Sequence, residues 1–121
     1  MRLKSYKLHF AASRVRVVFE GFDGPGVDLL GEVAAAAFAH ATGMLAWIDE
    51  RERGMKARSM SVDLDKRRVL ITFDVGGSRP VVVRVDEPAS VDLIARGEPL
   101  ERFLEARSEE AIRRRASVPA P

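Results

Sequence analysis

Alternation of apolar and polar residues with a period of two is the feature that most restricts the fold of this sequence. It occurs in residues 5–10 and 14–20, and again in three segments between residues 59 and 85. Because successive side chains of a β-strand point to opposite faces of the sheet, each segment predicts a half-buried strand. About five such strands, joined by short polar connections, predict a mostly antiparallel sheet.

The first two segments predict a β-hairpin, with residues 11–13 as its connector. One face of this hairpin is apolar and is expected to line the core. The core-facing residues are Tyr6, Leu8, Phe10, Val15, Val17 and Phe19. The other face is basic and is expected to be the outer one. Its residues are Lys7, His9, Arg14 and Arg16.

An alanine-rich segment, residues 27–41, predicts a helix after the hairpin. Its apolar residues recur at helical spacing. These are Leu30, Val33, Ala34, Ala37, Phe38 and Ala41. Asp28 and Glu32 lie early in the segment, where acids suit the positive end of a helix dipole, and Gly43 predicts its end. Residues 44–49 fit either a continuation of the helix or a short strand, and the sequence leaves both open.

A three-stranded meander and a helical C-terminus complete the predicted fold, which is of the α+β class. The meander strands are predicted at residues 59–64, 69–75 and 80–85, with a short helix or turn at 90–95 and a last helix from Pro99 to about Arg115. We expect the alanine-rich helix and the C-terminal helix to pack on one side of the sheet. Residues 1–116 are predicted to form a single domain and residues 117–121 a flexible tail. No internal repeat is visible, although the hairpin and the meander have a similar alternation of apolar and polar residues.

Composition excludes several classes of protein. The 121 residues include no cysteine, so disulfides, thiolate catalysis and thiolate metal sites are excluded. The N-terminal residues lack the apolar run of a secretory signal, and no apolar stretch approaches the roughly 20 residues that span a bilayer. We therefore expect a cytoplasmic protein that does not associate with membranes. The excess of arginine over lysine and the abundance of alanine indicate a GC-rich bacterial or phage gene.

No motif in the sequence predicts catalysis. The glycine-rich residues 21–26 lie between a strand and a helix, as phosphate-binding loops do, but their spacing is not G-x-G-x-x-G and no lysine follows. His9 and His40 are isolated and belong to no H-x-x-x-H pattern, so no metal site is predicted. We predict no cofactor and no catalytic residue. The sequence favours a protein that is not an enzyme, without deciding the question.

The remaining indications of function come from residues that are predicted to lie on the surface. Residues 1–20 are mainly basic, residues 21–50 hold acids and neither lysine nor arginine, and residues 51–68 are again mainly basic. Leu70 and Val82 alternate onto the face of the meander opposite its core residues. Either the C-terminal helix covers them or they form an interface. Trp47 is equally a core residue or an interface anchor.

These features give two hypotheses of function. The first is a non-enzymatic protein–protein interaction module, a small subunit, adaptor or accessory protein that self-associates or docks a partner, with Trp47, Leu70 and Val82 as candidate contacts. The alternative is a nucleic-acid-binding module that uses the hairpin face, with Lys7, His9, Arg14 and Arg16 as the binding residues. Single-strand binders pair such charge with exposed aromatic side chains, and here the hairpin aromatics alternate onto the core face.

Overall fold

The computed structural model describes residues 2–21, 26–52, 55–76 and 79–117. Its sheet contains six antiparallel strands in the order β3-β2-β1-β4-β5-β6. The strands are β1 (Leu3–His9), β2 (Arg14–Phe19), β3 (Val27–Leu30), β4 (Lys56–Asp63), β5 (Arg68–Asp74) and β6 (Val81–Val85). The predicted α+β class and mostly antiparallel sheet are therefore confirmed, with one strand more than expected.

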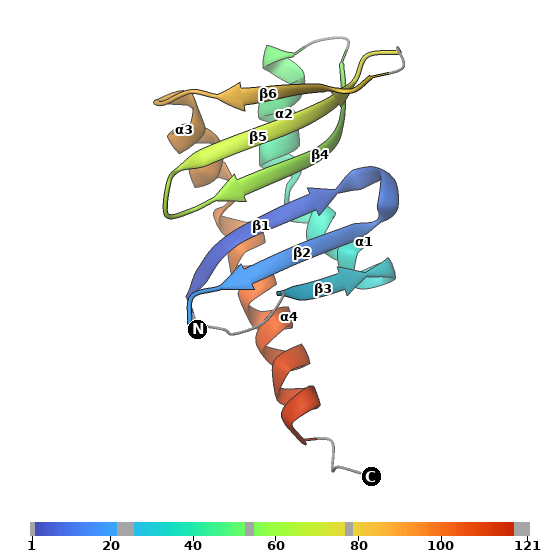
Figure 1. Cartoon of the computed structure of the whole chain (residues 1–121), viewed down its shortest axis with the longest axis vertical. Helices are drawn as coiled ribbons and strands as arrows, with labels where there is room; N and C mark the ends of the chain where they lie inside the picture. The colour runs from blue at the N-terminus through green and yellow to red at the C-terminus, as the bar shows by residue number, and fades with distance from the viewer. Residues whose placement is uncertain (1, 22–25, 53–54, 77–78, 118–121) are drawn as a thin grey trace.

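The described residues also form four α-helices and one short 3-10 helix. They are η1 (Phe10–Ala12), α1 (Gly31–Ala39), α2 (Thr42–Arg51), α3 (Ala89–Arg96) and α4 (Glu98–Ser117). All four α-helices lie behind the sheet in the view of Figure 1, so one face of the sheet is covered and the other is open. The core fills the space between the covered face and the helices.

The alternation of the hairpin places its side chains as predicted. Tyr6, Leu8, Val15, Val17 and Phe19 are all buried in the core. Phe10 differs, because the chain turns into η1 there and leaves the ring half-buried against Phe38, with ring centroids 5.3 Å apart.

The sixth strand occupies residues that the sequence assigned to the start of the helix. Val27 and Leu29 are buried while Asp28 and Leu30 are exposed, which is the pattern of a strand. Gly31 then has a φ of +58°, a left-handed conformation that favours glycine and separates this strand from the helix. Helical spacing misled the prediction at Leu30, and Asp28 lies on a strand instead of in the first helical turn.

The predicted helix is also divided near its end. α1 stops at Ala39, and α2 begins at Thr42, so Gly43 lies inside a helix and does not end one. Residues 44–49 are helical, which settles the ambiguity left by the sequence. The C-terminal helix continues to Ser117, past the expected end of the domain at residue 116. The rest of the predicted tail, residues 118–121, lies outside the described residues.

The chain order of the elements repeats, although the sequence shows no repeat. Three strands followed by two α-helices occur twice, as β1-β2-β3-α1-α2 and then as β4-β5-β6-α3-α4. Each half begins at the centre of the sheet and moves outward, and the halves join through the antiparallel pair of β1 and β4. The fold therefore has an approximate two-fold arrangement about the centre of the sheet (Figure 1).

The helices of each half reach across to the other half. α4 contacts β3 and α1, both of which belong to the first half. α2, from the first half, contacts α3 of the second half and lines a hollow beside β6. The core is consequently shared between the halves.

Candidate functional site

The open face of the sheet brings together two sets of residues that the sequence proposed separately. The basic hairpin residues lie on it, and so do Leu70 and Val82. The covering by the C-terminal helix that the sequence allowed does not occur, because α4 packs on the opposite face (Figure 1).

Strand register orders these side chains into two rows across the open face. One row runs from β2 to β6 through Arg16, Lys7, Ser61, Leu70 and Arg84. The neighbouring row runs through Arg14, His9, Ser59, Thr72 and Val82. Residues opposite each other on paired strands lie close enough to contact, so the face is basic over the hairpin and partly apolar towards β6.

Asp28 offsets much of the charge of the two hairpin arginines. Its carboxylate lies 3.4 Å from Nε of Arg14 and 3.5 Å from a terminal nitrogen of Arg16. The sequence could not reveal this arrangement, because it placed Asp28 in a helix instead of on a strand paired with β2. The two arginines are therefore less available to an outside anion than the sequence implied.

A trough opens beside the hairpin at the end of the sheet where η1 lies. It has a volume of about 500 Å³. Its lining comprises Lys7, His9, Ala11, Ala12, Arg58, Ser59, Thr72 and Pro80. Burial, followed by the positive charges of Lys7 and Arg14, lowers the pKa of His9 below its ordinary value of 6.5, although Asp28 acts in the opposite direction. Of the charged groups that act on His9, three are positive (Lys7, Arg14 and Arg16) and one, Asp28, is negative.

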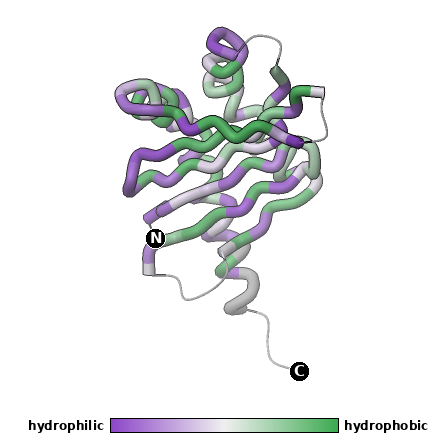
Figure 2. The backbone as a smooth tube through the Cα atoms, turned by 45° about the horizontal axis from the view of Figure 1, so that its top comes forward, coloured by the Kyte–Doolittle hydropathy of each residue, from purple (hydrophilic) through white to green (hydrophobic). Residues whose placement is uncertain are grey.

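The free edge of β6 is the second candidate surface. Val82 is 61% exposed, and Val81 is also exposed. Figure 2 shows hydrophobic residues along this strand at the margin of the sheet. On the helix side, Val83 and Val85 line a hollow of about 300 Å³ together with Trp47 and Ala89. Apolar side chains thus remain incompletely covered on both sides of this edge.

The opposite edge of the sheet, β3, differs from β6 in how the helices cover it. Its inward residues Val27 and Leu29 are buried, and α1 and α4 both contact the strand. α4 is a helix of 20 residues, whereas its counterpart α2 beside β6 has 10. The longer helix covers the β3 edge, and the shorter one leaves the hollow at β6.

Trp47 does not lie with Leu70 and Val82. It belongs to α2 on the covered side of the sheet, and it is only 4% exposed. Its indole Nε1 donates a hydrogen bond of 3.0 Å to Asp92 Oδ2 on α3. The guanidinium of Arg51 lies 4.4 Å from the ring centroid. The structure places this residue at the junction of the two helices and at the inner wall of the hollow.

Several trough residues were missed by sequence reasoning. Arg58, Ser59 and Thr72 were assigned to no site, because serine and threonine are ordinary on the solvated face of a strand. A break in the regular pairing between Ala57 and Ser59 locates Arg58 in an irregularity of β4. The pairing of β1 with β4, and of β4 with β5, brings these residues beside Lys7 and His9.

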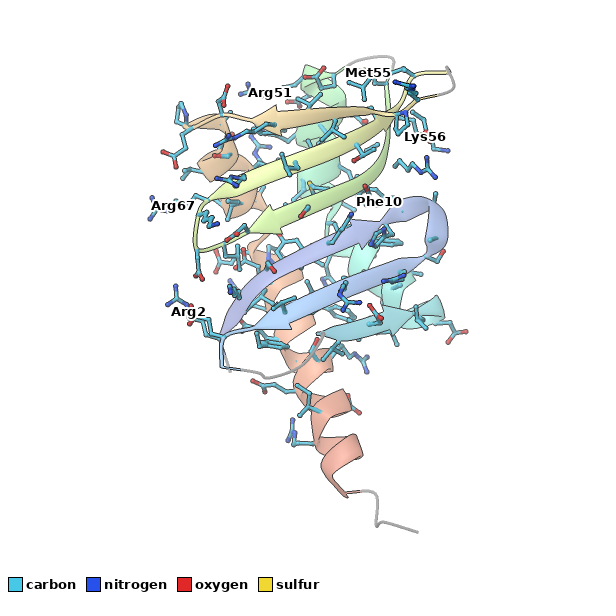
Figure 3. All side chains as sticks on the ribbon, viewed as in Figure 1. Arg2, Phe10, Arg51, Met55, Lys56 and Arg67 are labelled. Atoms are coloured by element: carbon cyan, nitrogen blue, oxygen red, sulfur yellow. The ribbon has the colours of Figure 1, made fainter. Side chains whose placement is uncertain are left out.

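The basic turn at residues 66–68 lies away from the trough. Lys66, Arg67 and Arg68 line a separate pocket of about 240 Å³, which Asp86 and Glu87 also line. Figure 3 shows Arg67 and Phe10 at opposite ends of the sheet, so this basic turn does not join the trough. In the glycine-rich segment 21–26, residues 22–25 lie outside the described residues.

Among the described residues, no group of three or more histidine, aspartate or glutamate side chains is positioned to hold a metal ion. No helix in the described ranges is both long enough and apolar enough to cross a membrane. The chain matches no protein-family model, no curated protein and no solved structure.

Proposed function

We propose that the protein is a non-enzymatic interaction module that self-associates through the free edge of β6. The observation that supports this proposal is the difference between the two edges of the sheet. At the β3 edge, α1 and α4 contact the strand and Val27 and Leu29 are buried, whereas β6 leaves Val82 exposed on the open face and a hollow on the helix side. An uncovered apolar edge strand readily pairs with another strand. A second copy would continue the sheet and cover the hollow.

The sequence of β6 is well suited to pairing with itself. In an antiparallel pair centred on Val83, Val81 lies opposite Val85 of the second copy, and Val82 lies opposite Arg84 of the second copy. The helix side of such a pair contains only valine, and no like charges lie directly opposite each other on the open side. A register centred on Arg84 would place two arginines together and is therefore disfavoured. The resulting interface uses the same patch on both subunits.

The test replaces Val82 by lysine and measures mass in solution across a range of concentrations, by sedimentation or light scattering. The wild-type protein is expected to dimerise. Val82→Lys should weaken the dimer by about tenfold or more, because symmetry places two lysines opposite two arginines. Leu30→Lys is the matched control, because Leu30 is also 61% exposed but lies on the β3 edge. It should leave the dimer intact.

A charge exchange tests the register itself. Val82→Glu should retain or strengthen the dimer, because each glutamate would face Arg84 of the second copy. The double variant Val82→Lys/Arg84→Glu should restore what Val82→Lys loses. A wild-type chain that remains monomeric at all concentrations contradicts the proposal, as does a dimer that only Leu30→Lys disrupts.

The nucleic-acid alternative has weaker geometric support. The four basic side chains do lie side by side on the open face, which favours it. However, Asp28 engages both arginines, and the hairpin aromatics Tyr6 and Phe19 are buried in the core. A stacking platform for bases is therefore absent from the described part of that face.

A further inference from the structure

The trough beside η1 has the composition of an anion site. Lys7 and His9 come from β1, Arg58 and Ser59 from β4, and Thr72 from β5. Each of these side chains can donate a hydrogen bond, and among the described residues no carboxylate lines the trough. Donors that approach from three strands suit an oxyanion with several oxygens.

The shape of the trough follows from the size of its floor residues. Ser59 lies opposite Thr72 on β5 and opposite His9 on β1. The short side chains of Ser59 and Thr72 therefore lie next to the longer side chain of His9. Ser59 is only 8% exposed and forms the floor. Ala11, Ala12 and Pro80 supply an apolar wall that could contact the uncharged part of a ligand.

The positively charged side chains of the trough are weakly paired with acidic side chains of the protein. Among the described residues, Lys7 forms no ion pair. Arg58 is paired only loosely, with a guanidinium nitrogen 3.9 Å from Asp74 Oδ1 and both side chains more than half exposed. Exposed pairs of this kind contribute little, so an incoming anion can displace Asp74. By contrast, Arg14 and Arg16 are held by Asp28 and face that carboxylate.

We propose that this trough binds a small organic phosphate ester, with Lys7 and Arg58 as the main charged contacts and Ser59 and Thr72 as hydroxyl donors. A phosphate group has more acceptor oxygens than a carboxylate and can use donors from all three strands. The volume of about 500 Å³ is within the range of small-molecule sites. This site does not depend on self-association through β6.

His9 provides a direct spectroscopic readout. Its pKa is lowered by burial and by Lys7, Arg14 and Arg16, and only Asp28 opposes them. Arg58 and Thr72 face the same trough from the neighbouring strands. A bound phosphate adds negative charge beside the imidazole, which favours its protonated form. Binding of the phosphate should therefore raise the pKa of His9.

The experiment follows both histidines of the full chain by NMR during pH titrations with phenyl phosphate, inorganic phosphate or acetate at constant ionic strength. Phenyl phosphate should raise the pKa of His9 saturably by at least about half a unit, and acetate should not. His40 is the internal control, because it lies in the helix layer, stacked on Phe103.

Two double variants, each of which removes two positive charges, distinguish a specific binding site from nonspecific electrostatic attraction. Lys7→Gln/Arg58→Gln should weaken phenyl phosphate binding at least about tenfold, because both charged contacts are lost. Arg67→Gln/Arg68→Gln removes two charges at the far end of the sheet and should leave binding unchanged. All four side chains are exposed, so neither variant is expected to disturb folding, which a thermal melt verifies.

Several outcomes would overturn the assignment. These are no saturable shift of His9, an equal effect of acetate, tighter binding of inorganic phosphate than of the ester, or equal losses in both double variants. A single-stranded oligonucleotide serves as the last probe. If it shifts His9 at lower concentration than either phosphate, and Arg14→Ala/Arg16→Ala abolishes that effect, the open face is a nucleic-acid surface and the small-ligand proposal is wrong.

Discussion

Gly26 illustrates how one residue without a side chain permits the β2–β3 connection. Its φ is +92°, and a Cβ added there would lie 2.7 Å from the carbonyl oxygen of Val17. A left-handed backbone and a close approach of another strand's backbone are both tolerated by glycine alone. Gly21 has a similar φ of +73°, but a Cβ there would meet nothing within 4 Å.

Replacing Gly26 by alanine should therefore destabilise the protein by about 2–4 kcal/mol, since backbone strain and a steric clash act together. Gly21→Ala should cost only about 1 kcal/mol, because it adds strain without a clash. Urea unfolding of the two variants measures the difference. Equal losses in both variants would show that the approach to Val17 has no energetic consequence.

Trp47 shows why a single residue type is a poor guide to an interface. Tryptophan is common both in cores and at binding surfaces, and the sequence alone predicted the two roles equally. The hydrogen bond from its indole to Asp92 and the burial of the ring connect α2 to α3. The contact crosses between the two halves of the chain and could be recognised only from the packing of the helices.

At the scale of elements, α4 combines a buried stripe with closely spaced acids. Leu100 and Leu104 are fully buried, whereas Glu101 between them is half-buried. Burial, followed by the like charges of Glu105 and Glu98, raises the pKa of Glu101 above its ordinary value of 4.5. The folded state consequently holds this proton more tightly than the unfolded state does.

The sign of the resulting pH dependence follows from linkage. Below pH 4.5 Glu101 is protonated in both states, and its contribution to stability is fully present. As the pH rises through the raised pKa, the folded state loses that proton at a cost and stability declines. Glu101→Gln should therefore raise the urea midpoint at pH 7 relative to wild type, with a smaller gain at pH 4.

Glu50→Gln is a suitable control for this measurement, because Glu50 is exposed on α2. It should change the midpoint little at either pH. A Glu101→Gln variant that is less stable than wild type at pH 7 would contradict the interpretation and show that the charged carboxylate stabilises α4.

The whole molecule depends on contacts between its two halves. β1 pairs with β4 at the centre of the sheet, and α4 covers β3 from the other half. Neither half can bury its apolar surface alone, since each would lose one side of its central strand and the helix of the other half that lies beside its outer strand. The repeated topology therefore does not imply two independent units.

Cleavage of the chain between the halves tests this dependence. A protease site inserted between Glu52 and Met55 should yield two fragments that remain associated under native conditions, because the inter-half contacts do not need the connection. The separated fragments should each be largely unfolded by circular dichroism, and mixing them should restore the native spectrum. Cooperative unfolding of either isolated fragment would show that it folds independently.

The sequence alone determined the features that depend on local periodicity. Alternation of period two identified the hairpin, its buried face and the meander, because side-chain direction along a strand is fixed by the backbone. The same alternation correctly directed Leu70 and Val82 away from the core. Periodicity failed at Val27–Leu30. This strand has only four residues, and they were assigned to the start of the longer helical pattern that follows.

Only the tertiary structure decided which surfaces meet. The pairing of β1 with β4 joins residues about 50 positions apart, and together with the pairing of β4 with β5 it creates the trough between Lys7, Arg58 and Thr72. The pairing of β2 with β3 decided that Asp28 would face Arg14 and Arg16. The different lengths of α2 and α4 left β6 as the uncovered edge. Such contacts depend on long-range packing, which local patterns of polarity do not encode.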